Sequence, residues 1–278
     1  MAKEINIVYT INPDINFWEN DWINELLPSK NNVIYNSITD LNTDIIYDNA
    51  IIITQDPKNC ESYLQKYIVN KKKFCLIHLS DEYYQHTLNV YASEYCYHIF
   101  RNYYTDRIKG SKISFIPLGY IQTFWKGYNG NKITDITVHD RKFIWTFYGS
   151  LQYSNREEHI TNIIDIKPNN YCDTLDWNSS VMIKPEKYRD ILLNTIFVPC
   201  LTGHKNVDTF RLYEALEAGC IPIVYCFQSI FGHYPCYGGC QYFLNLLGNH
   251  PLISIDNWDD LNKTIKFYLN DRNELEKK

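Results

Sequence analysis

The chain has 278 residues, of which 45% are hydrophobic and 21% are charged. This balance is typical of a folded globular protein and excludes a disordered or collagen-like chain. The net charge of -5 lacks the basic excess that nucleic-acid binding normally requires, so a DNA- or RNA-coating role is disfavoured. The length fits one large domain or two compact domains of about 140 residues each.

The N-terminal sequence and the cysteines predict the cellular location. Residues 1–6 have no basic region followed by an apolar one, and no stretch contains the roughly 18 apolar residues of a membrane-spanning helix. We therefore expect a cytoplasmic protein without a transmembrane segment. The nine cysteines lack the spacing of a secreted disulfide scaffold, which predicts mostly buried, reduced thiols. Asn, Ile, Lys and Tyr have AT-rich codons, and their abundance leads to the hypothesis of an AT-rich source such as a large DNA virus or a protist. For a viral protein the expected location is the host cytoplasm.

Short apolar runs alternate with amphipathic segments in the N-terminal half. The first run, residues 5–10, precedes a helical pattern of apolar residues that ends at Pro28. Strands are then predicted at residues 33–35, 50–54, 74–79, 97–100 and 113–117, with a helix at 60–69. Strands that alternate with helices indicate a parallel sheet covered on both faces.

A polar, turn-rich stretch separates this half from a second alternating series. We predict an N-terminal domain of residues 1–122, a linker of residues 123–140 and a C-terminal domain of residues 141–278. The C-terminal domain has predicted strands at 143–148, 195–199, 221–225 and 252–255, and helices at 155–164, 185–193 and 258–269. Each half is a plausible doubly wound sheet, in which ligands bind outside the carboxyl ends of the strands.

The most informative stretch, residues 197–224, reads as strand, polar loop, helix and strand. Asp208 or Thr209 is expected to cap the helix, and Gly219 to end it. Since the helix begins at the carboxyl end of the sheet, its free N–H groups and positive dipole end can receive a phosphate. Asp208 and Thr209 are therefore candidate donor-binding residues, although a simple capping role for Asp208 is the stronger alternative.

Three charged side chains lie on this helix or just before it. Lys205 and Arg211 can add positive charge to the phosphate receptacle. Arg211 and Glu214 are three residues apart and share a helical face, so both can project toward a ligand along the first turns. A carboxylate there could accept the two hydroxyls of a ribose. Taken alone, the pair is better explained as an ordinary salt bridge on a solvated helix.

Residues 211–224, R-L-Y-E-A-L-E-A-G-C-I-P-I-V, resemble the R-x-x-E-A-L-x-x-G-C-I-P-V-I signature of exostosin-like glycosyltransferases. The resemblance implies an α/β protein with the GT-B fold, in which two Rossmann-like, doubly wound parallel-sheet domains face each other across a cleft. It further implies that Glu214 holds the nucleotide ribose and that Arg211 lies against the diphosphate. Retaining GT-B enzymes of the E-x7-E group have an acid eight residues before this glutamate, where this chain has Asn206, so the inverting group is favoured.

A second group of donor-binding candidates follows the first strand of the C-terminal half. Gly149 lets the backbone approach a ligand closely, and Ser150 lies at the same sheet edge. Arg156, near the start of the next helix, could bind the diphosphate with both ends of its guanidinium group. The alternative is a surface arginine paired with Glu157 or Asp165.

The acceptor side is predicted in the N-terminal half, where His78 ends a buried strand. Inverting transfer needs one base within hydrogen-bond reach of the acceptor hydroxyl. Asp81 and Glu82 are the candidates for this base, with His78 behind them on the acceptor side. A helix cap made by Ser80 or Asp81 is the alternative explanation of this turn.

Further acceptor-side candidates are Arg101, Tyr103 and Tyr120, each of which follows a strand. Tyrosine rings suit the apolar faces of sugars, and an arginine suits an anionic partner. Packing and anchoring of the linker explain these residues equally well.

Cys226, His233, Cys236 and Cys240 offer the residue types of a zinc site. Their spacing matches no compact C-x2-C pair, and buried cysteine often serves as a small apolar residue, so we expect no metal.

Together, these features predict that the protein is a glycosyltransferase. It would move a sugar from a nucleotide sugar, a UDP-sugar by preference, to a hydroxyl of a glycan or glycoconjugate, with inversion and without a metal or other cofactor. The cations and the helix dipole would stabilise the leaving diphosphate. Two alternatives stay open: a catalytically inactive protein that binds nucleotide sugars or glycans, and a GT-B-like UDP-sugar epimerase. No nucleic-acid partner is expected.

Overall fold

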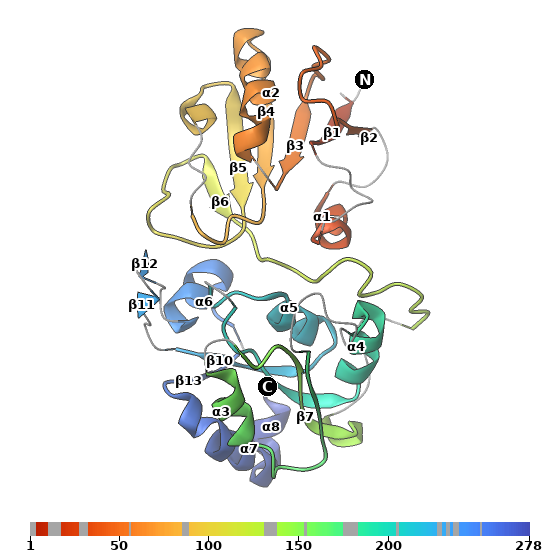
Figure 1. Cartoon of the computed structure of the whole chain (residues 1–278), viewed down its shortest axis with the longest axis vertical. Helices are drawn as coiled ribbons and strands as arrows, with labels where there is room; N and C mark the ends of the chain where they lie inside the picture. Colours follow the sequence, from red (N-terminus) through yellow and green to blue (C-terminus); the bar gives the residue numbers. More distant parts are fainter. Residues whose placement is uncertain are drawn as a thin grey trace. The chain divides into compact units, whose positions relative to one another are not determined.

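The structure is a computed structural model that describes most of the chain. The described residues are 4–10, 18–27, 33–55, 57–84, 89–130, 138–152, 155–174, 183–203, 206–226, 230–231, 234–235, 239–250 and 252–278. The chain divides into two compact units, Met1–Leu118 and Gly119–Lys278 (Figure 1).

The N-terminal unit is built on a six-stranded sheet in the order β2-β1-β3-β4-β5-β6, and every neighbouring pair is parallel. The strands are β1 (Ile5–Tyr9), β2 (Val33–Ser37), β3 (Ala50–Thr54), β4 (Phe74–His78), β5 (Cys96–Arg101) and β6 (Ile113–Phe115). The helices are α1 (Asn20–Leu26), α2 (Pro57–Val69) and the 3-10 helix η1 (Asn89–Ala92).

Both faces of this sheet are buried, because successive side chains of a strand point to opposite faces. Val8 and Ile52 belong to a core with Tyr63 and other residues of α2. Ile7 and Ile53, their neighbours along the strands, pack in a second core with α1. The apolar runs that predicted the strands thus supply two cores.

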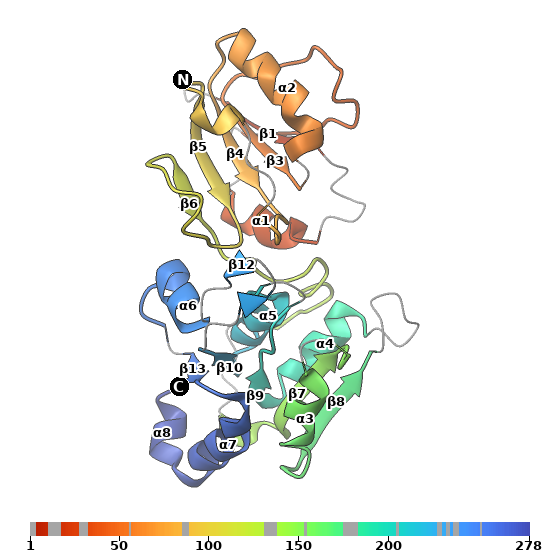
Figure 2. The ribbon, with the colours of Figure 1, turned by 60° about the vertical axis from the view of Figure 1, so that its left-hand side comes forward.

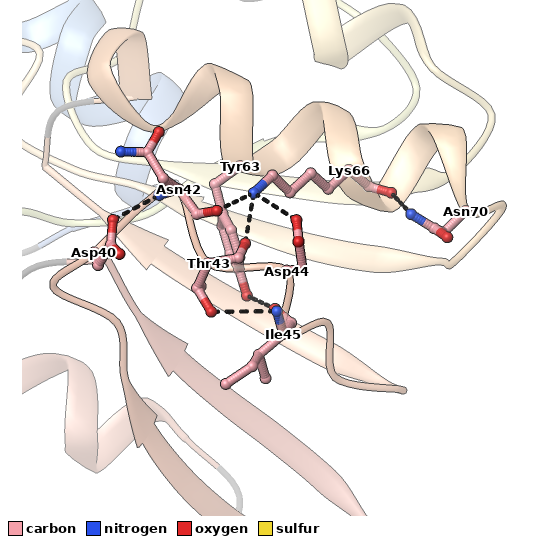
Figure 3. A network of polar contacts seen from close by, with 8 residues as sticks. All are labelled: Asp40, Asn42, Thr43, Asp44, Ile45, Tyr63, Lys66 and Asn70. Atoms are coloured by element: carbon pink, nitrogen blue, oxygen red, sulfur yellow. Dashed lines mark hydrogen bonds and ion pairs between the residues drawn. The ribbon is translucent and has the colours of Figure 1, made fainter.

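A network of polar contacts fastens the β2–β3 connection to α2 (Figure 3). Lys66 of α2 donates from Nζ to the carbonyls of Asn42 (2.7 Å) and Thr43 (2.6 Å) and to Oδ1 of Asp44 (3.3 Å). One helix turn away, the Tyr63 hydroxyl donates to the carbonyl of Ile45 (3.2 Å). These bonds satisfy carbonyl groups that the connection would otherwise leave unpaired.

The C-terminal unit contains a five-stranded parallel sheet in the order β13-β10-β9-β7-β8. Its strands are β7 (Phe143–Gly149), β8 (Asn169–Asp173), β9 (Thr195–Pro199), β10 (Ile221–Tyr225) and β13 (Ile253–Ile255), and β11 (Ile230–Phe231) pairs separately with β12 (Tyr234–Pro235). The α-helices are α3 (Arg156–Thr161), α4 (Pro185–Leu192), α5 (Phe210–Glu217), α6 (Gly239–Leu247), α7 (Leu261–Asn270) and α8 (Arg272–Glu276). The 3-10 helices are η2 (Val138–Asp140) and η3 (Trp258–Asp260).

Helices cover both faces of this second sheet as well. The helices α3, α7 and α8 lie on one side of it, and α4 and α5 on the other (Figures 1 and 2). Trp145 and Phe147 of β7 share a fully buried core with Ile160 of α3, Leu261 of α7 and Leu275 of α8. The two doubly wound parallel sheets that the sequence predicts are thereby confirmed.

The two sheets have the same topology. In each unit the first strand lies between the second and the third, and the later strands follow outward from the third. Chain connections leave the first strand and its neighbour in opposite directions at such a position, which opens a crevice at the carboxyl ends of the strands. In the C-terminal unit this switch point lies between β7 and β9.

The boundary between the units lies between Leu118 and Gly119. The described part of the predicted linker packs against helices of the C-terminal unit. Buried Arg189 of α4 donates from Nη1 to the carbonyls of Phe124 (3.0 Å) and Lys126 (2.9 Å). Trp125 donates from Nε1 to the Glu217 carboxylate of α5 (3.2 Å). This stretch is therefore a fixed part of the second unit over residues 119–130.

The cysteines follow the prediction of reduced thiols with one exception. Cys60, Cys96, Cys200 and Cys220 are buried and form no disulfide, whereas the structure pairs Cys226 with Cys240 in a disulfide. That pairing corrects the alternative in which both would be zinc ligands, since a disulfide sulfur is not a thiolate. The other two candidate ligands, at positions 233 and 236, lie outside the described residues.

Among the helices of the described residues, none combines the length and the hydropathy that crossing a bilayer requires.

Candidate functional site

Arg156 bridges the loops that follow β7 and β9, at the switch point of the C-terminal unit. Its Nη1 donates to the carbonyl of Ser150 (2.9 Å), and its Nη2 donates to the carbonyl of Thr202. The side chain is buried, and so is Ser150. Arg156 therefore fixes the shape of the crevice. The predicted binding of the diphosphate by Arg156, and the predicted place of Ser150 in the donor site, stay predictions.

Arg211 lies against the end of β7. Its Nη2 donates to the carbonyl of Tyr148 (2.8 Å), and its guanidinium carbon lies 4.5 Å from the ring centroid of Phe147. Stacking on an aromatic face stabilises a guanidinium group and fixes its plane. Within the described parts of the chain, the buried Nε–H of Arg211 has no hydrogen-bond acceptor. A fixed cation with an unused donor is suited to an anionic ligand.

Gly149 is required by this arginine. A Cβ atom at position 149 would lie 2.6 Å from Nη2 of Arg211 and 3.4 Å from the Phe147 ring. The first distance is shorter than any van der Waals contact, so a larger residue would displace the guanidinium group. Gly149 was predicted to let a ligand approach the backbone closely. In the structure it is the side chain of Arg211 that lies this close.

Glu214 is buried one helical turn after Arg211 on α5. Burial raises the pKa of its carboxyl group to about 7, while the charge of Arg211 and a hydrogen bond from the backbone of Ile121 lower it by smaller amounts. The carboxyl group therefore changes charge near neutral pH. It also lies where the chain enters the second unit, because Ile121 belongs to the stretch that packs on α4 and α5.

Replacing Glu214 with Gln is expected to change how stability depends on pH. The pKa of Glu214 in the folded protein lies above its ordinary value of 4.5, so its stabilising contribution is complete below about pH 4.5 and is lost as the pH rises through about 7. Glutamine does not titrate. The unfolding free energy of Glu214→Gln relative to wild type should rise by up to about 3 kcal/mol between pH 5 and pH 8. Urea unfolding at the two pH values measures this difference, and parallel pH profiles would contradict it.

The N-terminus of α5 differs from the expected capped end. Thr209 occupies the N-cap position, but its side chain makes no capping bond, and its buried Oγ1 has no partner among the described residues. The neighbouring Asp208 is buried, and its carboxylate accepts a hydrogen bond from the Tyr242 hydroxyl (2.9 Å). The predicted N-cap position is therefore confirmed at Thr209, without the side-chain hydrogen bond that usually accompanies it. In the first turn of α5 the amide of Leu212 donates to the Thr209 carbonyl (3.1 Å), and the positive end of the helix dipole faces this edge of the sheet.

The C-terminus of α5 matches the expectation. Gly219 has a φ of +65°, and the amides of Gly219 and Cys220 donate back to the carbonyls of Leu216 (3.0 Å) and Ala215 (2.8 Å). This pair of bonds is the Schellman arrangement, in which glycine takes the left-handed conformation at low cost. Lys205, the other predicted cation of the site, lies outside the described residues.

Tyr188 of α4 is a site residue that the sequence analysis missed. The ring contacts Tyr148 at the end of β7, with 5.6 Å between the centroids. The hydroxyl is buried and finds no hydrogen-bond partner in the part of the chain that the structure describes. Burial raises the pKa of Tyr188, while the charge of Arg211 lowers it and that of Glu214 raises it by smaller amounts, so the three groups share one neighbourhood. A tyrosine on a helix has no distinguishing sequence signal.

In the N-terminal unit, three predicted acceptor-side residues form one buried cluster. Asp81 and Arg101 make an ion pair of 2.8 Å in which both side chains are at most 2% exposed. Tyr91 accepts a hydrogen bond from Arg101 (3.4 Å), and its hydroxyl also bonds to Nδ1 of His78. The neighbouring Glu82 is half-buried. The roles of Asp81 and Glu82 as base, and of His78 and Arg101 at the acceptor, stay predictions.

The two predicted acceptor-side tyrosines are both buried. Tyr103 follows β5 with a φ of 58°, an unusual backbone conformation for a bulky residue. Tyr120 is 1% exposed, packs 5.8 Å from the ring of Phe124 and belongs to the C-terminal unit. Tyr120 therefore packs in the interior, as the alternative explanation of this residue expected. Contact of either ring with an acceptor stays a prediction.

The family of the chain follows from a comparison with family profiles. Residues 125–277, more than half of the chain, match the profile of the RXYLT1 C-terminal domain. The chain belongs to this family. The family is related to glycosyltransferases, which gives glycosyl transfer as the reaction class. The match contains Arg211, Glu214 and the other described candidates of the switch point, whereas the N-terminal unit lies before it.

A solved structure resembles the chain over nearly its whole length. The crystal structure of an alpha1,3-fucosyltransferase superposes with a TM-score of 0.56 and covers 99% of this chain and 82% of its own, at 12% sequence identity. At that identity the likeness shows the fold alone, which is the two-domain GT-B fold. Among curated protein sequences, none matches the chain.

Proposed function

We propose that the protein transfers a glycosyl group from a nucleoside diphosphate sugar, a UDP-sugar by preference, to a hydroxyl of a glycan or glycoconjugate. The observation that carries the proposal is the unused Nε–H donor of Arg211, a guanidinium group held on Phe147 beside the uncapped start of α5. A cation and the positive end of a helix dipole at a switch point are suited to a diphosphate.

Each part of the donor has a candidate partner in the C-terminal unit. The diphosphate lies against Arg211 and the first amides of α5, and the ribose hydroxyls donate to Glu214 when its carboxyl group is ionised. As the bond between the sugar and the phosphate breaks, negative charge grows on the diphosphate oxygen. Arg211 and the helix dipole stabilise that charge, so the proposed mechanism uses no metal.

Transfer proceeds with inversion in this proposal. The acceptor oxygen attacks the anomeric carbon from the side opposite the leaving diphosphate, and a carboxylate of the N-terminal unit receives the proton. Two finer assignments rest on the sequence alone and are proposals: kinship with the exostosin-like group, based on the motif at 211–224, and a cytoplasmic location in a host infected by a large DNA virus.

The function is tested by incubating the protein with a panel of UDP-sugars, with and without sugar acceptors. Release of UDP that depends on the acceptor supports transfer. Isomerisation of the donor sugar without an acceptor would instead support an epimerase, and binding without turnover an inactive binding protein. A protein that binds no nucleotide sugar contradicts the proposal altogether.

Gly149→Ala is expected to weaken UDP-sugar binding by about tenfold, since the new methyl group displaces Arg211 and breaks its bond to Tyr148. Stability should change by less than about 1 kcal/mol, because a flexible side chain gives way rather than the backbone. Calorimetric titration with a UDP-sugar measures the affinity. Gly110→Ala is the control, since its Cβ would meet Ile113 at an ordinary 3.6 Å. Unchanged affinity in Gly149→Ala would show that Arg211 does not need its observed position.

A further inference from the structure

Glu19, which precedes α1, is a buried carboxylate that no step of the proposed reaction uses. It is 1% exposed. Its oxygens accept hydrogen bonds from Gln55 Nε2 (2.8 Å), Ser80 Oγ (2.9 Å) and Asn102 Nδ2 (3.3 Å). These partners follow β3, β4 and β5, so one carboxylate gathers three loops at the carboxyl edge of the N-terminal sheet.

Ser80 connects this buried carboxylate with solvent. The residue is exposed, although its hydroxyl donates to Glu19. Its φ is 63°, a left-handed conformation that serine rarely adopts. The backbone amide of Ser80 donates to Oδ1 of Asn102 (3.0 Å), so Asn102 holds both Ser80 and Glu19. A strained residue that its surroundings hold in place is a recurring feature of functional sites.

The surroundings of Glu19 favour proton uptake. Burial raises the pKa of its carboxyl group, and hydrogen bonds from Ser80, Gln55, the Glu19 backbone and Asn102 lower it by less. Several ionisable groups lie on the adjoining elements: Tyr9 on β1, Asp21 and Glu25 on α1, the Asp81–Arg101 ion pair, and Glu82. Oδ2 of Asp81 already accepts a hydrogen bond from Nη2 of buried Arg101 (2.8 Å), so Asp81 is engaged in an ion pair away from Glu19.

We propose that Ser80 and Glu19 form a proton relay for the acceptor hydroxyl, with Ser80 Oγ in contact with the acceptor. This inference rests on the proposed function. The acceptor O–H proton passes to Ser80 Oγ as the Ser80 proton passes to Oε1 of Glu19. The acceptor oxygen forms its bond to the anomeric carbon, and the bond from that carbon to the diphosphate breaks with its electron pair on the diphosphate. Glu19 ends neutral and later returns its proton to solvent through Ser80.

The relay is tested by steady-state kinetics of Ser80→Gly and Glu19→Gln. Glycine removes the hydroxyl and suits the φ of 63°, which offsets part of the stability lost with the hydrogen bond to Glu19, so Ser80→Gly is expected to fold. Both variants should lose about 100-fold in kcat, the lower range for general base catalysis, with donor KM and UDP affinity within about twofold of wild type. The acid limb of the pH–rate profile should disappear in Glu19→Gln.

Ser114→Ala is the matched control. It removes a serine hydroxyl that bonds to Nε2 of His98 (2.9 Å) in the same unit, and its kcat should stay within about twofold of wild type. Near wild-type kcat in Ser80→Gly overturns the relay while leaving the proposed function intact. If Glu19→Gln fails to fold, the Ser80→Gly result decides alone. A wild-type protein without acceptor-dependent UDP release overturns both the relay and the proposed function.

Discussion

Arg211→Ala is expected to weaken UDP-sugar binding by at least about 100-fold. The substitution removes a cation and charge-assisted hydrogen bonds to the diphosphate, each worth about 1.5 to 3 kcal/mol. Titration calorimetry with a UDP-sugar measures the loss. Arg211→Lys keeps the positive charge but loses the several N–H donors of the guanidinium group and its stacking on Phe147. Its affinity for the UDP-sugar is therefore expected to lie between those of wild type and Arg211→Ala.

Arg272→Ala provides the control for loss of positive charge in the same unit. Arg272 is exposed at the start of α8, so its removal should leave the affinity within about twofold of wild type. Thermal unfolding checks that each variant retains the fold. Wild-type affinity in Arg211→Ala would contradict the assignment of the diphosphate to this side chain.

Asp81→Ala is expected to destabilise the N-terminal unit by about 3 to 5 kcal/mol. The substitution leaves the guanidinium group of Arg101, which is 0% exposed, without its counter-charge. Urea unfolding followed by circular dichroism measures the effect. The double variant Asp81→Ala with Arg101→Met should recover part of the loss, because it removes both charges from the interior.

Asp44→Ala provides the matched contrast. Asp44 also forms an ion pair, with Lys66, but its side chain is fully exposed to solvent, so no measurable loss of stability is expected. If Asp81→Asn keeps wild-type stability but has a reduced kcat, the ion pair is not needed for stability. Asp81 would then be the catalytic base, as predicted from the sequence.

The strands that the sequence predicts best are those in the middle of the sheets. The apolar runs at Ala50–Thr54, Thr195–Pro199 and Ile221–Tyr225 match β3, β9 and β10 residue for residue, because strands buried on both faces carry apolar side chains throughout. The edge strand β8 has the sequence N-N-Y-C-D and was missed, since an edge strand needs few apolar residues. The amphipathic helix α6 was also missed, because the glycine and cysteine at its start were interpreted as part of the loop after the strand at 221–225.

The sequence predicts those residues of the candidate site that lie close together in the chain, and it misses those that only the fold brings together. Arg211 and Glu214 were found because they are neighbours on one helix and belong to a dense local motif. Glu19 was not found, since its three partners lie 36, 61 and 83 residues away in the chain. Only the sheet topology brings the ends of β3, β4 and β5 together around it. Asp81 and Arg101 were each found as polar residues after a strand, but their pairing required the register of β4 and β5.

The most direct test of the proposed donor site is hydrogen–deuterium exchange with and without saturating UDP. The account predicts slower exchange in three segments of the C-terminal unit: the end of β7 with the loop after it, the loop after β9, and the first turn of α5. Bound diphosphate occupies the amides there and restricts their opening. Unchanged exchange in all three segments, whether or not other parts of the chain respond to UDP, would contradict the assignment of this switch point as the nucleotide-sugar site.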